Sequence, residues 1–188
     1  MYKYGSRKLI EAFIEGLRTF KPTYKLNVEG ETMYVPRYIS KLYAEDIIKA
    51  IDAKHARIKT EQSILNNLKK ENKTIDDIFG ARVYGGYTTN KFNTKINEIK
   101  KILKEKGIEL IGHNDFNKET YVGSNIKAKL KYGVPLEIQV SPGPIADFAQ
   151  RMQHYAYKPE LYGTTKFDQF VLNNLAKMIL YPIRKMRQ

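Results

Sequence analysis

Apolar residues recur along this chain with two different periods, and each period predicts one type of element. Spacings of three and four residues predict amphipathic helices, whereas strict alternation predicts half-buried strands. The helical spacing covers residues 7–20, 43–54, 62–71, 91–106, 144–157 and 166–180. Residues 23–41 follow neither period, and we expect an extended or irregular chain there.

Short apolar or alternating runs between these helices predict strands. They cover residues 78–84, 108–111, 126–131 and 136–140. Gly107 follows the helical stretch 91–106 at the position where a left-handed residue commonly ends a helix. Helices interleaved with strands predict an α/β or α+β domain, built as a small mixed sheet flanked by helices. Because no repeat, low-complexity run or linker interrupts the chain, we expect residues 1–188 to form one domain.

The last two predicted strands have the pattern of a hairpin. A three-residue connection at residues 133–135 places all the apolar side chains on one face and the polar ones on the other. The predicted pairs are Lys131 with Glu137, Lys129 with Gln139, and Leu130 with Ile138. On this pattern alone, lysines beside a carboxylate are explained more simply by an exposed cross-strand ion pair than by a functional site.

Charge narrows the range of partners. The chain has 33 Lys and Arg against 20 Asp and Glu, which gives a net charge of +13. Such an excess favours a polyanionic partner: a nucleotide, RNA, DNA or an anionic membrane surface. No apolar run approaches the roughly 18 residues of a membrane span, and the N-terminal residues do not resemble a signal peptide. Cysteine is absent, which excludes disulfides, thiolate nucleophiles and cysteine metal sites. We therefore expect a soluble, cytoplasmic protein.

Two groups of side chains could carry chemistry. Arg57 and Lys59 lie two residues apart, so on an extended segment they point the same way and could clamp the phosphates of one nucleotide. Asp77 precedes one predicted strand and Glu137 lies on another. Two such carboxylates could share Mg²⁺, which usually takes one or two carboxylates together with substrate phosphates. Taken alone, Asp77 is equally well explained as a helix cap or turn residue.

These groups belong to a series of short motifs that occur in a characteristic order. The series is Arg57-Ile58-Lys59 with Ser63, Asp77-Ile78-Phe79-Gly80-Ala81-Arg82, Tyr121, Glu137-Ile138-Gln139-Val140, and His154 with Tyr157-Lys158. In order and spacing it resembles the synthetase domain of the Rel/Spo family, with its R-x-K…S, D-x-x-G-x-R and E-I-Q-[IV] motifs. The resemblance covers residues 50–158, flanked by helices expected within 1–49 and 160–188. It is closest to the single-domain small alarmone synthetases and their toxic relatives, and implies their nucleotidyltransferase-like fold.

The resemblance implies a reaction and a role for each residue. Pyrophosphate would pass from ATP to a ribose 3′-hydroxyl by in-line attack on the β-phosphorus, releasing AMP. The residues expected to bind ATP are Arg57, Lys59, Ser63, Lys69, Lys70 and Arg82. Asp77 and Glu137 would bind Mg²⁺, and Glu137 could instead take the proton of the acceptor hydroxyl. The acceptor would contact Tyr121, Asn125, Lys118, Gln139 and His154, with Tyr121 stacked on its base.

The acceptor motif departs from the family pattern K-x-N-G-Y-x-S-x-H. Glu119 stands where asparagine is expected, Asn125 where histidine is expected, and Lys118 lies one place from the usual cation. Ser141 and Pro142 likewise replace the usual arginine and threonine. The acceptor could therefore be a guanine nucleotide, as in alarmone synthesis, or the 3′ end of tRNA, as in a toxin. A catalytically silent RNA-binding or assembly module, for example of phage or mobile-element origin, is the alternative. The partners to expect are an antitoxin or a second copy of the chain.

Overall fold

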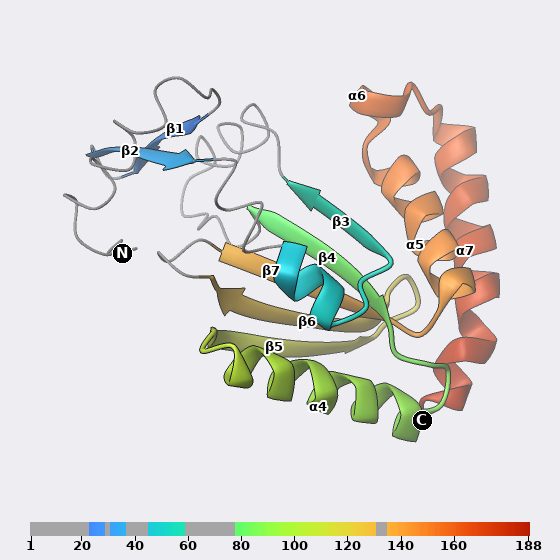
Figure 1. Ribbon diagram of the computed structural model, residues 1–188. Coiled ribbons are helices and arrows are strands. Elements are labelled where there is room, and N and C mark those ends of the chain that lie inside the picture. Colours follow the sequence, from blue (N-terminus) through green and yellow to red (C-terminus); the bar gives the residue numbers. More distant parts are fainter. Residues whose placement is uncertain (1–22, 29–30, 37–44, 59–77, 131–134) are drawn as a thin grey trace.

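The computed structural model describes residues 23–28, 31–36, 45–58, 78–130 and 135–188 (Figure 1). The described strands are β1 (Thr23–Val28), β2 (Glu31–Pro36), β3 (His55–Ile58), β4 (Phe79–Tyr84), β5 (Glu109–Asn117), β6 (Val122–Lys129) and β7 (Pro135–Ser141). The described helices are α4 (Thr89–Glu105), α5 (Pro144–Tyr157), α6 (Pro159–Tyr162) and α7 (Lys166–Met186), with a further helical turn at 45–50. A mixed sheet flanked by helices confirms the expected fold class.

The sheet has five strands in the order β3-β4-β7-β6-β5, and β1 pairs with β2 in a separate two-stranded sheet. Strands β4 and β7 are parallel, while β3–β4, β7–β6 and β6–β5 are antiparallel. The two parallel strands lie next to each other near the centre of the sheet. Their shared direction brings the carboxyl ends of β4 and β7 to one edge, where α5 begins.

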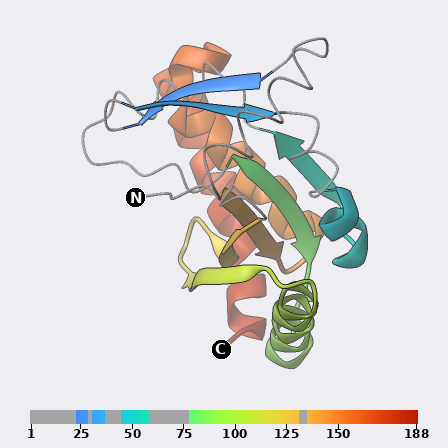
Figure 2. The same ribbon diagram turned by 60° about the vertical axis from the view of Figure 1, so that its left-hand side comes forward.

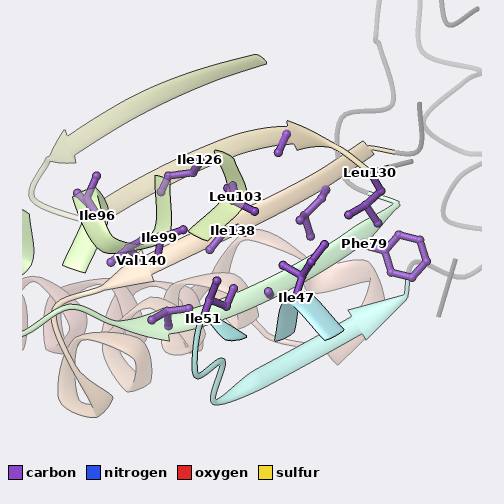
Figure 3. Packing of buried hydrophobic residues seen from close by; sticks show 14 of the residues in the cluster. Ile47, Ile51, Phe79, Ile96, Ile99, Leu103, Ile126, Leu130, Ile138 and Val140 are labelled. Carbon is purple, nitrogen blue, oxygen red and sulfur yellow. The ribbon is translucent and has the colours of Figure 1, made fainter. Parts of the chain in front are cut away.

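One face of this sheet carries the main hydrophobic core (Figure 3). Alternate residues of β4, β6 and β7 point into it, among them Phe79, Ile126 and Ile138. Helix α4 covers this face with the apolar stripe that its sequence predicts, namely Phe92, Ile96, Ile99 and Leu103. The helical turn at 45–50 and the residue after it add Ile47 and Ile51 to the same core.

Helices α5 and α7 form a second layer, packed side by side (Figures 1 and 2). A smaller core joins them to the start of β6 and consists of Val122, Ala146, Ala149, Ala176, Leu180 and Ile183. This layer explains why alternation fails at residues 122–124, all of which are buried. The start of β6 is covered on both faces, whereas its later residues alternate.

Helix ends follow partly from the sequence. Gly107 has φ +66 directly after α4, as expected. Thr165 caps the start of α7 with a capping box: its side chain accepts a hydrogen bond from the backbone N–H of Asp168, and the Asp168 side chain accepts one from the backbone N–H of Thr165. The expected end of this helix near residue 180 is wrong, because α7 continues through Pro182 to Met186. The added turn buries Ile183 and brings the guanidinium of Arg187 over the ring of Phe92, 3.6 Å from its centroid. Tertiary contacts thus compensate for the backbone hydrogen bond that proline removes.

The hairpin prediction is wrong in its register. Strand β6 ends at Lys129 and β7 begins at Pro135, so the connection is longer than three residues. Glu137 faces Lys127 rather than Lys131, and Gln139 faces Asn125 rather than Lys129. Ile126, rather than Leu130, lies opposite Ile138. The shift is an even number of residues, so each side chain keeps its predicted face. In the observed register the ladder also includes the pair of Ser124 with Val140.

The remaining sequence predictions have mixed outcomes. The strands predicted at 108–111 and 126–131 are observed as the longer Glu109–Asn117 and Val122–Lys129. The helix predicted at 43–54 is helical over 45–50, and the extended prediction for 23–41 includes β1 and β2. The helices predicted at 7–20 and 62–71 lie outside the described residues. Within the described part of the chain, no helix is long and apolar enough to span a membrane.

Candidate functional site

The sheet face opposite α4 is polar, and its side chains stand in two rows across four strands. Residues that pair directly on neighbouring strands share a face. The first row is Arg57 (β3), Gly80 (β4), Glu137 (β7) and Lys127 (β6). The second row is His55, Arg82, Gln139 and Asn125 on the same strands. The pairing thus brings Arg57, Arg82, Glu137 and Gln139, which are far apart in the sequence, onto one small surface.

Gly80 leaves room in the first row for its neighbour. A Cβ atom built on Gly80 would lie 3.1 Å from Nε and 3.2 Å from Cγ of Arg57. The side chain of Arg57 therefore crosses directly over Gly80, in the direction of Glu137 on the next strand. The glycine of the D-x-x-G-x-R motif has here a steric role: it lets the arginine lie flat across the strand.

Three side chains of the site form a hydrogen-bonded chain. One terminal nitrogen of Arg82 donates to Oε1 of Gln139, and Nε2 of Gln139 donates to Oε1 of Glu137 over 2.8 Å. Glu137 and Gln139 are partly buried on the polar face of β7. Arg82 thus fixes the orientation of the Gln139 amide, and that amide fixes one oxygen of Glu137.

Asp147, in the first turn of α5, holds the other side of Arg82. Its side chain is fully buried, and Oδ1 accepts a hydrogen bond from a terminal nitrogen of Arg82. Its Oδ2 accepts from Tyr84 Oη at 3.3 Å and lies 3.3 Å from a terminal nitrogen of Arg151 and 3.9 Å from Nε2 of His55. Burial, and then the Asp147 charge, raise the pKa of Tyr84 above its usual value, which keeps this hydroxyl a donor.

The sequence did not point to Asp147. An aspartate in the first turn of a helix is ordinarily explained by the helix dipole. Two further signals were present: a position flanked in the sequence by the small apolar residues Ala146 and Ala149, where a charge is costly unless it is paired, and arginines on neighbouring elements. His55 has a side chain that is 57% exposed, yet its Nε2 lies at the edge of this cluster.

Toward its C-terminus, α5 brings His154 and Lys158 near the arginines of the sheet. Burial lowers the pKa of His154, and the charges of Lys158, Arg57 and Arg82 lower it further. At neutral pH this imidazole is therefore predominantly neutral, so one ring nitrogen can donate and the other accept a hydrogen bond. Its Nδ1 lies 3.4 Å from the hydroxyl of Tyr162 on α6.

The residues expected to bind the acceptor lie around the β5–β6 turn. Tyr121 ends this turn, donates a 2.9 Å hydrogen bond from its hydroxyl to Asn125 Oδ1, and packs edge-on against Phe116. Burial raises the pKa of Tyr121 to about 12, with opposing smaller effects of nearby charges. Lys118 lies over the ring of Phe116, 5.6 Å from its centroid. Glu119 pairs with Lys177 of α7 at 3.2 Å, so α7 partly neutralises the unexpected carboxylate.

Several predicted site residues are not placed. Lys59, Ser63, Lys69, Lys70 and Asp77 lie outside the described residues. Among those that the structure describes, no three His, Asp or Glu side chains gather as a metal site would require if the protein supplied most ligands. A single partly buried carboxylate, Glu137, beside cationic side chains is compatible with Mg²⁺, because this ion takes one or two carboxylates and completes its shell with phosphates and water.

Comparison with known proteins yields a distant structural similarity. No protein-family model matches the sequence, and no curated protein matches it. A crystal structure of the complex between the Type VI effector Tas1 and its immunity protein includes a similar chain. The two chains are 18% identical, and the alignment covers 95% of this chain and 91% of that one, with a TM-score of 0.35. At this TM-score the similarity carries no argument about activity.

Proposed function

We propose that this protein is a Rel/Spo-type pyrophosphotransferase that moves the β,γ-pyrophosphate of ATP onto a ribose 3′-hydroxyl. The observation that carries the proposal is the convergence of Arg57, Arg82, Glu137 and Gln139 on one sheet face. Residues from separate sequence motifs are thus neighbours in space. It supplies cations for a polyphosphate and one oriented carboxylate among them, as a phosphoryl-type transfer requires.

The cations divide the work on ATP. Arg57 lies flat across Gly80 and would approach the phosphates from the β3 side of the sheet. Arg82, held between Asp147 and Gln139, keeps its charge at a fixed point and would neutralise negative charge on the phosphates from the sheet. Arg151 adds positive charge from α5. Fixed cations stabilise developing charge without having to reorient during the reaction.

Glu137 would act on the acceptor side of the transferred group. Its Oε1 is held by Gln139, and it lies beside Lys127 in the first row. In this position it would hold Mg²⁺, with Asp77 as the second carboxylate in the proposal. When bound, the ion would neutralise negative charge on the phosphates of ATP. Glu137 is also placed to orient or accept the proton of the attacking 3′-hydroxyl.

For the acceptor, we propose the 3′-terminal nucleoside of tRNA. Glu119 places a carboxylate where the family holds a 5′-phosphate. The side-chain oxygen of Asn125 already accepts a hydrogen bond from the Tyr121 hydroxyl. This arrangement disfavours a free 5′-diphosphate more than a nucleoside joined to a chain. The net charge of +13 also favours binding of a large polyanion such as tRNA. A guanine nucleotide is the competing acceptor within the same reaction.

Radiolabelled ATP tests the reaction and the acceptor together. The protein is incubated with Mg²⁺ and ATP labelled at either the γ- or the α-phosphate, with GDP, GTP and bulk tRNA offered separately. We expect label from the γ-position on tRNA and none from the α-position, since pyrophosphate transfer leaves the α-phosphate in AMP. Glu137→Gln is the matched inactive variant, because it removes the charge while keeping an amide that can meet Gln139.

Each outcome is decisive for one part of the proposal. γ-Label on GDP or GTP instead of tRNA retains the reaction and overturns the acceptor. α-Label on any acceptor replaces pyrophosphate transfer with nucleotidyl transfer. If no acceptor is labelled at any enzyme concentration, the proposed activity is wrong and the RNA-binding or assembly function replaces it.

A further inference from the structure

We infer that Asp147 is a positioning residue that sets the geometry of the site through Arg82, an inference that rests on the proposed function. Four donors or cations from three elements point at this one buried carboxylate: His55 from β3, Arg82 and Tyr84 from β4, and Arg151 from its own helix. These contacts therefore converge on a residue of α5, which lies outside the sequence motifs carried by the strands.

A carboxylate with no solvent exposure is unfavourable unless it is fully paired. Asp147 faces two guanidinium groups, so its charge is more than balanced and the cluster keeps a net positive charge. Removing the carboxylate would leave Arg82 and Arg151 to repel one another. Arg82 would then turn toward solvent, since nothing else described on the α5 side holds it.

The effect of Asp147 reaches the reacting end through hydrogen bonds already in place. The sequence of contacts is Asp147 to Arg82, Arg82 to Gln139, and Gln139 to Glu137. The guanidinium is planar and offers its two terminal nitrogens in a fixed fork, so the direction of one bond dictates the direction of the other. Asp147 thus orients Glu137 through two intermediate side chains, Arg82 and Gln139.

The placement of α5 makes this arrangement rigid. The helix begins two residues after β7: Pro142 and Gly143 form the connection, and Pro144 is the first residue of α5. Ala146 and Ala149 on either side of Asp147 are completely buried. A Cβ on Gly143 would meet the Tyr87 hydroxyl at 2.5 Å, so the connection packs tightly. Asp147 therefore has little freedom, as an anchor requires.

Two substitutions test the anchor from its two sides. Asp147→Asn keeps the size and loses the charge; Arg82→Lys keeps the charge but cannot hold Asp147 and Gln139 with one planar fork. We expect each to lower kcat about 100-fold, the loss associated with a misplacement of about 1 Å. The double variant should lose no more than about twofold beyond either single variant, because both changes break the same chain. Asp168→Asn, an exposed first-turn aspartate of α7, is the matched control and should keep its kcat.

A spectroscopic measurement on the free protein separates positioning from the proposed reaction. Arg82 held at both ends should give slowly rotating, resolved side-chain NH signals in nitrogen-15 NMR, assigned by their absence in Arg82→Lys. We expect Asp147→Asn to broaden or remove these signals at a temperature where circular dichroism shows both proteins folded. Should Asp147→Asn fail to fold, Arg82→Lys and Gln139→Leu carry the same test, with equal and non-additive losses of kcat.

Three results would overturn the inference: unchanged Arg82 signals in Asp147→Asn, additive losses in the double variant, or full kcat in Arg82→Lys. A wild-type protein that labels no acceptor has a different meaning. That result would reject the proposed function, while the NMR comparison would still decide whether Asp147 holds Arg82.

Discussion

At the scale of single residues, Gly80 shows how a missing side chain contributes to a site. We expect Gly80→Ala to raise the KM for ATP about tenfold, the cost of losing one charge-assisted contact of roughly 1.4 kcal/mol. The reason is the 3.1 Å approach between the new Cβ and Nε of Arg57, which is tighter than ordinary contact and displaces the arginine from its position across the strand by a few tenths of an ångström. The free energy of unfolding should change by less than about 1 kcal/mol, because the displaced group is a partly exposed side chain.

Steady-state kinetics with varied ATP, together with urea denaturation, checks this prediction. Gly112→Ala on β5 is the matched control, since no atom lies within 4 Å of its added Cβ. An unchanged KM in Gly80→Ala would mean that the position of Arg57 over Gly80 does not matter for ATP.

Tyr121 gives a residue-scale prediction about pH. Its pKa is raised from 10.0 to about 12, chiefly by burial. Below pH 10 the tyrosine is protonated in both the folded and the unfolded chain, and its contribution to stability is fully present. Between pH 10 and 12 the unfolded chain loses the proton first, so stability falls by up to roughly 2–3 kcal/mol.

Urea denaturation of the wild type and of Tyr121→Phe at pH 8 and near pH 11 isolates this effect. The variant should be less stable at pH 8 by about 1 kcal/mol, since it loses the hydrogen bond to Asn125. That difference should shrink or reverse near pH 11, because only the wild type pays the cost of keeping the proton. A difference that stays constant with pH would show that Tyr121 ionises as an exposed tyrosine does.

At the scale of elements, the distance between β6 and β7 depends on one glycine. A Cβ on Gly123 would lie 2.7 Å from the backbone oxygen of Val140, which a ladder strand cannot move away. We expect Gly123→Ala to lower the free energy of unfolding by at least about 2 kcal/mol. Gly112→Ala on the neighbouring strand should be neutral, or stabilising by roughly 0.5 kcal/mol. Chemical denaturation of both variants checks the contrast, and equal effects would contradict the observed packing.

The elements also show where sequence prediction succeeds. The apolar stripe of α4 and the alternation in β6 and β7 identify the buried face correctly, because both depend on local periodicity. The hairpin register does not follow from that periodicity. A shift of any even number of residues leaves Glu137 and Gln139 on the same face, and only the full ladder from Ser124 to Lys129 selects their partners.

The site was predictable to the extent that it consists of strand residues. Arg57, Arg82, Glu137 and Gln139 could be named from motif order, and their convergence needs only that the strands become neighbours. Asp147 and the pairing of Glu119 with Lys177 could not be named, because both depend on how α5 and α7 pack against the sheet. No local pattern in the sequence records that packing.

At the scale of the whole molecule, the net charge of +13 should govern how the acceptor is bound. Binding of tRNA releases counterions, so the affinity falls steeply with salt. With roughly five phosphate contacts, we expect it to fall about 10- to 20-fold for each doubling of salt concentration. A free nucleotide contacts the protein through its own phosphates alone, and its affinity should depend on salt much less.

Two matched lysines locate the tRNA on the molecule. Lys158 lies near His154 at the end of α5, whereas Lys104 is exposed in the last turn of α4, a helix that covers the opposite sheet face. If the terminal nucleoside enters the polar face, Lys158→Ala should reduce the salt slope by about one and Lys104→Ala should leave it unchanged. Titration of labelled tRNA at several salt concentrations measures both slopes. A loss of slope in Lys104→Ala alone would mean that the basic surface of α4 binds the RNA, which would place the polyanion on the face away from Glu137 and exclude the proposed transfer to it.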